Sequence, residues 1–291
     1  MKKYLPFLIL FALGLLVYAN SLFGDFMQDD FALIVENEFL RSWGSVPEFF
    51  TNSVIRGSGY LSNLYRPVAL MFYFVLYQVF ELNVVGYHLF NILLHIVNAC
   101  LVFCLFKRLK FVEMGAFLAA VLFLVHPTQV ESVSYIAGLP DVLSSFFVIL
   151  GLTIWAKADK WRDQVGVAML FVLGLFTKES AIVLLPMIVV LSFYQKNWKE
   201  RIWGFVLMSV VAGAYLVLKF VVLDFVLESG SNTYTENLGF RLIYFVNTIW
   251  DYLVILVWPV TLYFERIFDA TIFGNYLDLI SWKTMVGTMF V

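Results

Sequence analysis

The chain has 291 residues, of which 62% are hydrophobic and only 14% are charged. Soluble domains contain roughly 45–50% apolar and about 25% charged residues, and a soluble chain of this size could not bury so much apolar surface. The 19 basic and 21 acidic residues leave a net charge of −2, so there is no basic excess with which to bind nucleic acid. The composition therefore predicts an integral membrane protein and excludes soluble and nucleic-acid-binding classes.

Apolar runs recur along the whole chain, and about 20 apolar residues are needed to span the hydrocarbon core. The runs that we interpret as spans are 5–23, 87–106, 114–125, 142–156, 165–176, 181–194, 202–222, 242–258 and a last run from about residue 279. The segment Pro67–Glu81 is shorter and opens with a proline suited to a first helical turn, which predicts an interfacial or re-entrant helix. The predicted fold class is all-α integral membrane, a multi-span helical bundle forming one polytopic domain over residues 1–291.

The basic residues predict the orientation of these spans, because positively charged loops stay in the cytoplasm. Four clusters at 2–3, 107–110, 157–162 and 196–201 hold more than half of the 19 basic residues. These clusters fall at alternate ends of successive spans only if the segment 67–81 does not cross the membrane. Residues 24–85 then form a large first extracytoplasmic loop. Residues 2–19 also fit a cleavable signal peptide, and in either case the chain from Asp25 onward lies outside.

With this topology the uncommon polar side chains gather at the extracytoplasmic face. They are Asp29 and Asp30 after the first span, His126, Glu131 and Asp141 between the third and fourth, and Lys178 and Glu179 between the fifth and sixth. Each alone fits a solvated loop charge, a structural ion pair or a helix stop signal. Charged groups near hydrocarbon are costly, so several of them gathered at one surface from distant loops favour a functional site. Lys178 also breaks the pattern of basic clusters, which predicts an anionic partner.

A second set of polar residues lies within the apolar run 87–106. They are His88, Asn91, His95 and Asn98, and their 3, 4, 3 spacing places all four on one face of a helix. We expect them to form hydrogen bonds between helices, as buried amides and imidazoles do in membranes. Zinc binding is the less favoured alternative because His88 and His95 would need further ligands. His88 is nearest the outer surface and is expected to border the site.

Two classes of function fit a polar site at the membrane boundary. In the first, a group is transferred from a lipid-anchored phosphate: an outer-loop carboxylate acts as the general base, and Lys178 stabilises the charge of the departing phosphate. The alternative is a polytopic transporter or flippase of a lipid-linked or small substrate. That class predicts charged groups near mid-bilayer, where only Lys219 and Asp251 qualify. The long loop 24–85 and the charges at one face favour the transferase.

A series of short motifs follows one another along residues 1 to about 265. They are an acidic pair after the first span, Tyr65-Arg66-Pro67, the run from Gly86 to His95, His126-Pro127 with Glu131, Gly138-Leu139-Pro140-Asp141, and Lys178-Glu179-Ser180. This order resembles the membrane part of the transmembrane-and-tetratricopeptide-repeat O-mannosyltransferases and their bacterial relatives. The resemblance implies a GT-C-type helical bundle and a glycosyltransferase that uses polyprenyl-phosphate sugars, with interfacial helices in its first extracytoplasmic loop.

The resemblance also implies roles for individual residues. Asp29 or Asp30 would supply the catalytic carboxylate. The expected substrate-binding residues are Arg66, His88, His126, Glu131, Asp141, Lys178 and Glu179. The partners would be a polyprenyl- or dolichyl-phosphate sugar, membrane lipid, and an acceptor protein or glycan. Paired acids sometimes bind Mg²⁺ or Mn²⁺, but many enzymes of this fold need no metal, so we expect no metal and no cofactor.

Two departures from the family pattern are visible. The family's Gly-Arg-Ala-Asp is Gly138-Leu139-Pro140-Asp141 here, so the role of that arginine falls to another residue. No tetratricopeptide repeats follow, and the sequence stops within an apolar segment. This predicts a C-terminally truncated chain, with absence of the repeats as the alternative. The expected location is a bacterial inner membrane, with a multi-pass chain and an active site that faces outside.

Overall fold

A computed structural model describes residues 4–158, 160–223, 225 and 238–260. Its contacts divide the chain into two units, residues 1–226 and 227–291, and each unit is treated by itself. All elements of the described ranges are helices or helical turns. Four helices are long and apolar enough to cross a membrane, and the bent pair Glu113–Val125 and Pro127–Ser134 would be a fifth. These findings confirm the predicted fold class of a multi-span helical membrane protein.

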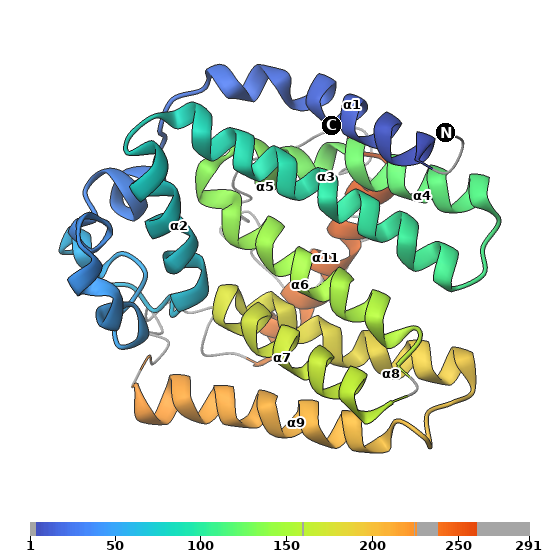
Figure 1. The fold of residues 1–291 in the computed structure, drawn as a ribbon. Coiled ribbons are helices and arrows are strands. Elements are labelled where there is room, and N and C mark those ends of the chain that lie inside the picture. Colours follow the sequence, from blue (N-terminus) through green and yellow to red (C-terminus); the bar gives the residue numbers. More distant parts are fainter. Residues whose placement is uncertain (1–3, 159, 224, 226–237, 261–291) are drawn as a thin grey trace. The chain divides into compact units, whose positions relative to one another are not determined.

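One group of helices in the first unit packs around the longest helix. Its members are α1 (Leu5–Tyr18), α3 (Val84–Arg108), α4 (Glu113–Val125) and α6 (Leu139–Trp155). Figure 1 shows α1, α3 and α4 side by side, with α6 running on toward the rest of the unit. Their shared core includes Leu10, Ile92 and Leu124, each fully buried. Burial of such side chains is the main stabilising contribution to this group.

The polar face of α3 lies inside this group. The side-chain amides of Asn91 and Asn98 donate to the carbonyls of Tyr135 at 3.1 Å and Val142 at 2.9 Å. Nε2 of His95 lies 3.1 Å from the carbonyl oxygen of Leu124. The predicted hydrogen bonds between this helix and its neighbours are therefore confirmed for three of its four polar residues, and they fix α3 against α4, α6 and the segment before α6.

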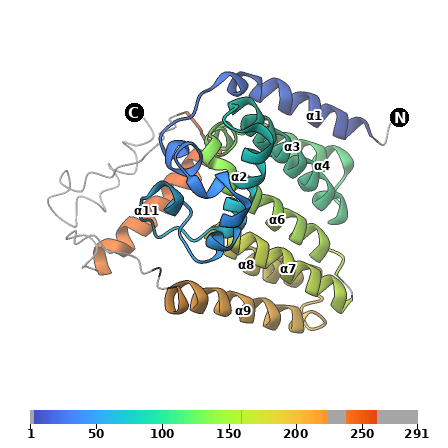
Figure 2. The ribbon, with the colours of Figure 1, turned by 60° about the vertical axis from the view of Figure 1, so that its left-hand side comes forward.

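A second group of helices packs on the other side of α6. Its members are α7 (Trp161–Thr177), the 3₁₀ turn η8 (Glu179–Val183), α8 (Leu184–Gln195), α9 (Ile202–Val217) and the π turn η9 (Leu218–Val222). Figures 1 and 2 both place α7, α8 and α9 together on this side. Trp155, Phe171, Leu184 and Met208 form its core, with no exposed surface. Helices α7 and α8 have 17 and 12 residues, fewer than the about 20 that span the hydrocarbon core.

The chain between α1 and α3 folds into short turns that pack on one α-helix. The turns are η1 (Ala19–Phe23), η2 (Phe31–Val35), η3 (Glu38–Arg41), η4 (Trp43–Phe50) and η5 (Arg56–Ser58), and the helix is α2 (Pro67–Phe80). Pro67 opens α2 at its first turn, where its missing N–H costs no hydrogen bond. Leu40, Phe49 and Phe74 are buried between the turns and α2. This packing places Arg66, just before α2, beside the second group of helices.

The rest of the first unit connects α4 to α6. It consists of η6 (Pro127–Gln129), α5 (Val130–Ser134) and η7 (Ile136–Gly138). The second unit contains α11 (Leu238–Val257), close to the predicted span 242–258. The last predicted span, from about residue 279, lies outside the described residues.

Candidate active site

The two acidic residues after α1 have different environments. Asp30 is 1% exposed: its Oδ2 accepts from the N–H of Met27 at 2.9 Å, and its Oδ1 accepts from the N–H of Ala137 at 2.7 Å. Burial raises the pKa of Asp30 to about 6, against the lowering effect of these two hydrogen bonds. Asp29 is exposed, and its backbone N–H donates to the hydroxyl of Tyr135 at 3.0 Å. Asp30 thus anchors the loop while the carboxylate of Asp29 stays accessible.

The backbone before this pair is strained. Gln28 has a φ of 42°, in the left-handed region that non-glycine residues rarely adopt. Such strain persists only where the surroundings fix the backbone, and it concentrates at functional sites. Here the hydrogen bonds of Asp29 and Asp30 to residues over 100 positions away supply that fixation.

Tyr135 brings three carboxylates together. Burial raises the pKa of the Tyr135 hydroxyl to about 12, and the negative charges of Asp29, Asp30 and Glu131 also act on it. Glu131 is exposed on the short helix α5, whose backbone leads directly to Tyr135. The structure therefore gathers Glu131 and the acidic pair around this tyrosine, although the sequence offered no signal that singled out Tyr135.

His126 and His88 have local contacts at the edge of this region. Nδ1 of His126 accepts from the N–H of Thr128 at 3.3 Å and lies 2.8 Å from its Oγ1, so the ring caps the turn η6. His88 is buried on α3, and Gly24 leaves room for its ring: a Cβ atom on Gly24 would lie 3.2 Å from Nε2. Both residues support the loops that carry the acidic groups.

An ion pair joins the start of α6 to the end of α7. Nζ of Lys178 lies 2.5 Å from Oδ1 of Asp141. Asp141 is in the first turn of α6, where the helix dipole favours a negative charge. The side chains of Asp141 and Lys178 are 38% and 26% exposed, respectively, so both ions are accessible from outside the bundle. Lys178 is therefore paired with an anion of the protein itself, and its role toward a donor phosphate stays a prediction.

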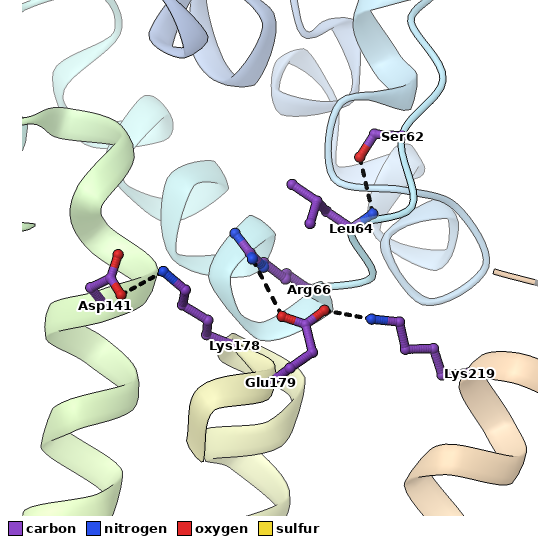
Figure 3. A network of polar contacts seen from close by, with 7 residues as sticks. All are labelled: Ser62, Leu64, Arg66, Asp141, Lys178, Glu179 and Lys219. Atoms are coloured by element: carbon purple, nitrogen blue, oxygen red, sulfur yellow. Dashed lines mark hydrogen bonds and ion pairs between the residues drawn. The ribbon is translucent and has the colours of Figure 1, made fainter. Parts of the chain in front are cut away.

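Glu179 forms a second set of ion pairs with cations from two other elements. Its carboxylate oxygens lie 3.3 Å from a guanidinium nitrogen of Arg66 and 2.6 Å from Nζ of Lys219, and Figure 3 shows it between these two side chains. Burial raises the pKa of Glu179, but the hydrogen bond from Lys219 and the charge of Arg66 outweigh it, so the pKa lies below its ordinary value. Glu179 is therefore ionised at neutral pH.

Tyr73 connects the acidic pair to these ion pairs. Its hydroxyl is fully buried and donates to the carbonyl of Ile136 at 3.2 Å. Burial raises the pKa of Tyr73 well above its ordinary value, and the charges of Asp30, Arg66 and Asp141 all act on the hydroxyl. The charges of one acid of the pair, Asp30, and of two members of the ion pairs, Arg66 and Asp141, thus act on the same buried hydroxyl.

The site includes residues that sequence reasoning did not assign to it. Lys219, a mid-bilayer candidate under the transporter alternative, pairs with Glu179. Tyr73 and Tyr135 are two of 15 tyrosines, and nothing in their local sequence distinguishes them. Within the described part of the chain, no group of three or more His, Cys, Asp or Glu side chains is placed to hold a metal ion.

Comparison with known proteins identifies distant homologues of this chain over much of its length. A protein O-mannosyl-transferase of Caenorhabditis elegans is 27% identical over 268 residues, which cover 89% of this chain and 38% of that protein. The protein O-mannosyl-transferase TMTC2 of Mus musculus is 33% identical over 154 residues, covering 50% of this chain and 18% of that protein. TMTC4 of Homo sapiens is 28% identical over 177 residues, covering 55% and 24%.

The resemblance predicted from the motifs is thereby confirmed as distant homology to the TMTC proteins. The chain spans well under half the length of these relatives. No family model matches the chain, and no solved structure matches it significantly.

Proposed function

We propose that this chain carries the active site of a glycosyltransferase that moves a sugar from a polyprenyl-phosphate donor to an acceptor hydroxyl. The observation that carries the proposal is that one short connection, residues 135–141, anchors the loop of an accessible carboxylate, Asp29, and carries Asp141, which pairs with the cation Lys178. General-base catalysis needs an accessible carboxylate, and a departing phosphate needs a cation that stabilises its charge. Homology to proteins named protein O-mannosyl-transferases supports mannose as the sugar and a protein Ser or Thr side chain as the acceptor.

In the proposed reaction Asp29 takes the proton of the acceptor hydroxyl as the acceptor oxygen bonds to the anomeric carbon of the sugar. The bond between that carbon and the phosphate oxygen breaks, and the polyprenyl phosphate leaves with the electron pair. Asp30 is a positioning residue, because its carboxylate is occupied by two backbone N–H groups. Lys178 and Arg66 would face the donor phosphate, whose charge they stabilise before and after the transfer.

The basic clusters support a site on the extracytoplasmic face of the membrane, in the loop 24–85 and the loops beside it. The membrane that we propose is a bacterial inner membrane. For the transporter alternative, one of the two mid-bilayer candidates, Lys219, pairs with Glu179. The long loop 24–85 and the charges gathered at one face support the transferase instead.

The test is release of sugar by the purified chain from a panel of radiolabelled polyprenyl-phosphate sugars. Wild-type protein should transfer label from one member of the panel. Asp29→Asn should lower turnover by roughly 10²–10⁴-fold with donor binding unchanged, which is the usual contribution of a general base. Asp25→Asn, which alters another exposed acid of the same loop, is the matched control and should behave as wild type.

Two results would contradict the proposal. If no donor in the panel loses its sugar, the chain is not a transferase of this class. If Asp29→Asn turns over at the wild-type rate, the carboxylate role is wrong.

A further inference from the structure

The cations around Glu179 come from elements that are far apart in the sequence. Arg66 precedes α2, and Lys219 lies in the π turn η9 at the end of α9. Their side chains are 16% and 8% exposed, whereas that of Glu179 is 32% exposed. The cations are therefore held deep in the site, and the carboxylate between them is its most accessible member.

Two hydrogen-bond donors at this position are unused. Among the described residues, Nε of Arg66 and the hydroxyl of Tyr215 are buried and have no hydrogen-bond partner. Tyr215 is 6% exposed, and its hydroxyl interacts electrostatically with Glu179 and Arg66. Buried donors without an acceptor are unfavourable. Their presence beside an ion cluster points to an additional acceptor that binds there.

The charges of the cluster identify that acceptor as an anion. Arg66 and Lys219 carry two positive charges, and Glu179 supplies one negative charge. The neighbouring pair of Asp141 and Lys178 is neutral as a whole (Figure 3). Each carboxylate oxygen of Glu179 already pairs with one cation, so Glu179 has no oxygen left for Nε of Arg66 or for the hydroxyl of Tyr215. A ligand with more oxygen atoms could engage both cations and these two donors. A phosphate ester has that number of oxygens, and Arg and Lys are its usual partners.

An apolar crevice begins at the same place. It lies between α7 and α9, has a volume of about 180 Å³, and is lined by Val172, Leu175, Phe176, Val211, Ala214, Tyr215 and Leu218. Pockets for whole ligands measure about 300–1,000 Å³, so this crevice fits only a segment of an apolar chain. Tyr215 lines the crevice, and the charges of Glu179 and Arg66 act on its hydroxyl. Leu218, which also lines the crevice, directly precedes Lys219. A lipid phosphate carries an apolar chain next to an anionic group, so its chain fits the crevice and its phosphate fits the cations beside it.

We propose that Arg66, Tyr215 and Lys219 form the seat of a lipid phosphate, that Glu179 occupies this seat as an exchangeable internal anion, and that the crevice between α7 and α9 takes the first apolar units of the lipid. This inference rests on the proposed function and names the residues of the same site that would hold the phosphate of its lipid partner. On binding, the carboxylate of Glu179 leaves the two cations and phosphate oxygens replace it. Between binding events Glu179 keeps the buried cations paired, since an unpaired buried charge is strongly destabilising.

The test measures binding of farnesyl phosphate to the purified full chain in detergent, with farnesol and inorganic phosphate as separate arms. Farnesyl phosphate should bind at least about tenfold more tightly than either, because only it fills both parts of the seat. Lys219→Gln and Tyr215→Phe should each weaken its binding, the former by about tenfold or more. Glu179→Gln should tighten binding several-fold, since a neutral amide competes less with the phosphate.

Lys107→Gln is the matched control, because Lys107 also forms an ion pair, with Glu113 at 3.7 Å, but at the far end of α3. It should bind farnesyl phosphate as wild type does. Should Lys219→Gln or Glu179→Gln fail to fold, Tyr215→Phe still decides the question, because it removes only a hydroxyl that has no hydrogen-bond partner in the unliganded structure.

Four results would overturn the inference. They are weaker binding by Glu179→Gln, unchanged binding by Lys219→Gln and Tyr215→Phe, farnesol binding as tight as that of farnesyl phosphate, and no binding by wild type. If the variants bind normally while wild type still releases sugar, the seat lies elsewhere and the proposed function stands. If the predicted order of binding appears but no sugar is transferred, the seat stands and the proposed transferase reaction is wrong.

Discussion

Asp29 and Asp30 are neighbours in the chain with different surroundings. The backbone N–H groups of Met27 and Ala137 occupy both oxygens of Asp30, which is almost completely buried. Asp29 is exposed. A base must reach the proton that it removes, so accessibility assigns the chemistry to Asp29 and the positioning to Asp30.

Asp30→Ala should therefore destabilise the protein. The N–H groups of Met27 and Ala137 would lose their acceptor, at a cost of about 1–3 kcal/mol. The loss should also depend on pH. The pKa of Asp30 is raised to about 6 in the folded chain, so its contribution to stability is fully present below its unfolded pKa and is lost as the pH rises through about 6.

The difference in unfolding midpoint between wild type and Asp30→Ala, measured in detergent, should thus be larger at pH 4 than at pH 7.5. Asp25→Ala, which removes an exposed carboxylate, should shift the midpoint little at either pH. A difference that grows toward pH 7.5 would show that the folded state favours the ionised form of Asp30.

At the scale of elements, the short connection from α5 to α6 positions most of the site. It carries the N–H of Ala137 that binds Asp30, the carbonyl of Ile136 that binds Tyr73, and the start of α6 with Asp141. Gly138 lies at its centre. A Cβ atom on Gly138 would lie 2.8 Å from the carbonyl carbon and 2.9 Å from the Cα of Ser132. Backbone atoms cannot rotate away as a side chain does, so the connection would have to move.

Gly138→Ala should consequently lower stability by about 1–3 kcal/mol, as overpacking does, and should slow sugar transfer by displacing Ala137 and Asp141. Gly166→Ala is the matched control. No atom lies within 4 Å of a Cβ built on Gly166, and alanine favours the helix α7 over glycine by up to about 1 kcal/mol. Thermal unfolding and turnover of the two variants decide the matter: equal behaviour would mean that the connection adapts to the added methyl group.

At the scale of the whole molecule, the proposed function requires the loop 24–85 to face outside. Cysteine labelling in intact cells tests this topology in a background where Cys100 and Cys104 are replaced by Ala. Ser58→Cys should react with a membrane-impermeant maleimide, whereas Lys110→Cys should react only after permeabilisation. Labelling of Lys110→Cys in intact cells would reverse the orientation and place the acidic pair inside.

The first unit joins two groups of helices and the turns around α2, and the site lies where all three meet. Arg66 comes from the turns, Asp141 from the helix shared by both groups, and Lys178, Glu179 and Lys219 from the second group. No single group holds the whole site. Ligand binding that moves α9 relative to α2 would therefore change the separation of Arg66 and Lys219.

Local properties of the sequence determined much of this protein. Apolar run length predicted helices at each expected span within the described residues, and the 3, 4, 3 spacing predicted the buried face of α3 with Asn91, His95 and Asn98. These features repeat with the period of a helix, so the chain displays them before any packing is known. The acidic pair and Lys178-Glu179 were likewise visible as charges beside apolar runs.

Only the tertiary structure decided which of these charges meet. Lys178 pairs with Asp141 rather than with its neighbour Glu179, and Glu179 pairs with Arg66 and Lys219. Tyr73 and Tyr135 became site residues because packing placed their hydroxyls against the backbone of Ile136 and of Asp29. Such pairings depend on which helix faces which and at what rotation, and residues 37 to 113 positions apart contain no local signal of that. Periodicity defines the faces of a helix, whereas packing alone selects their partners.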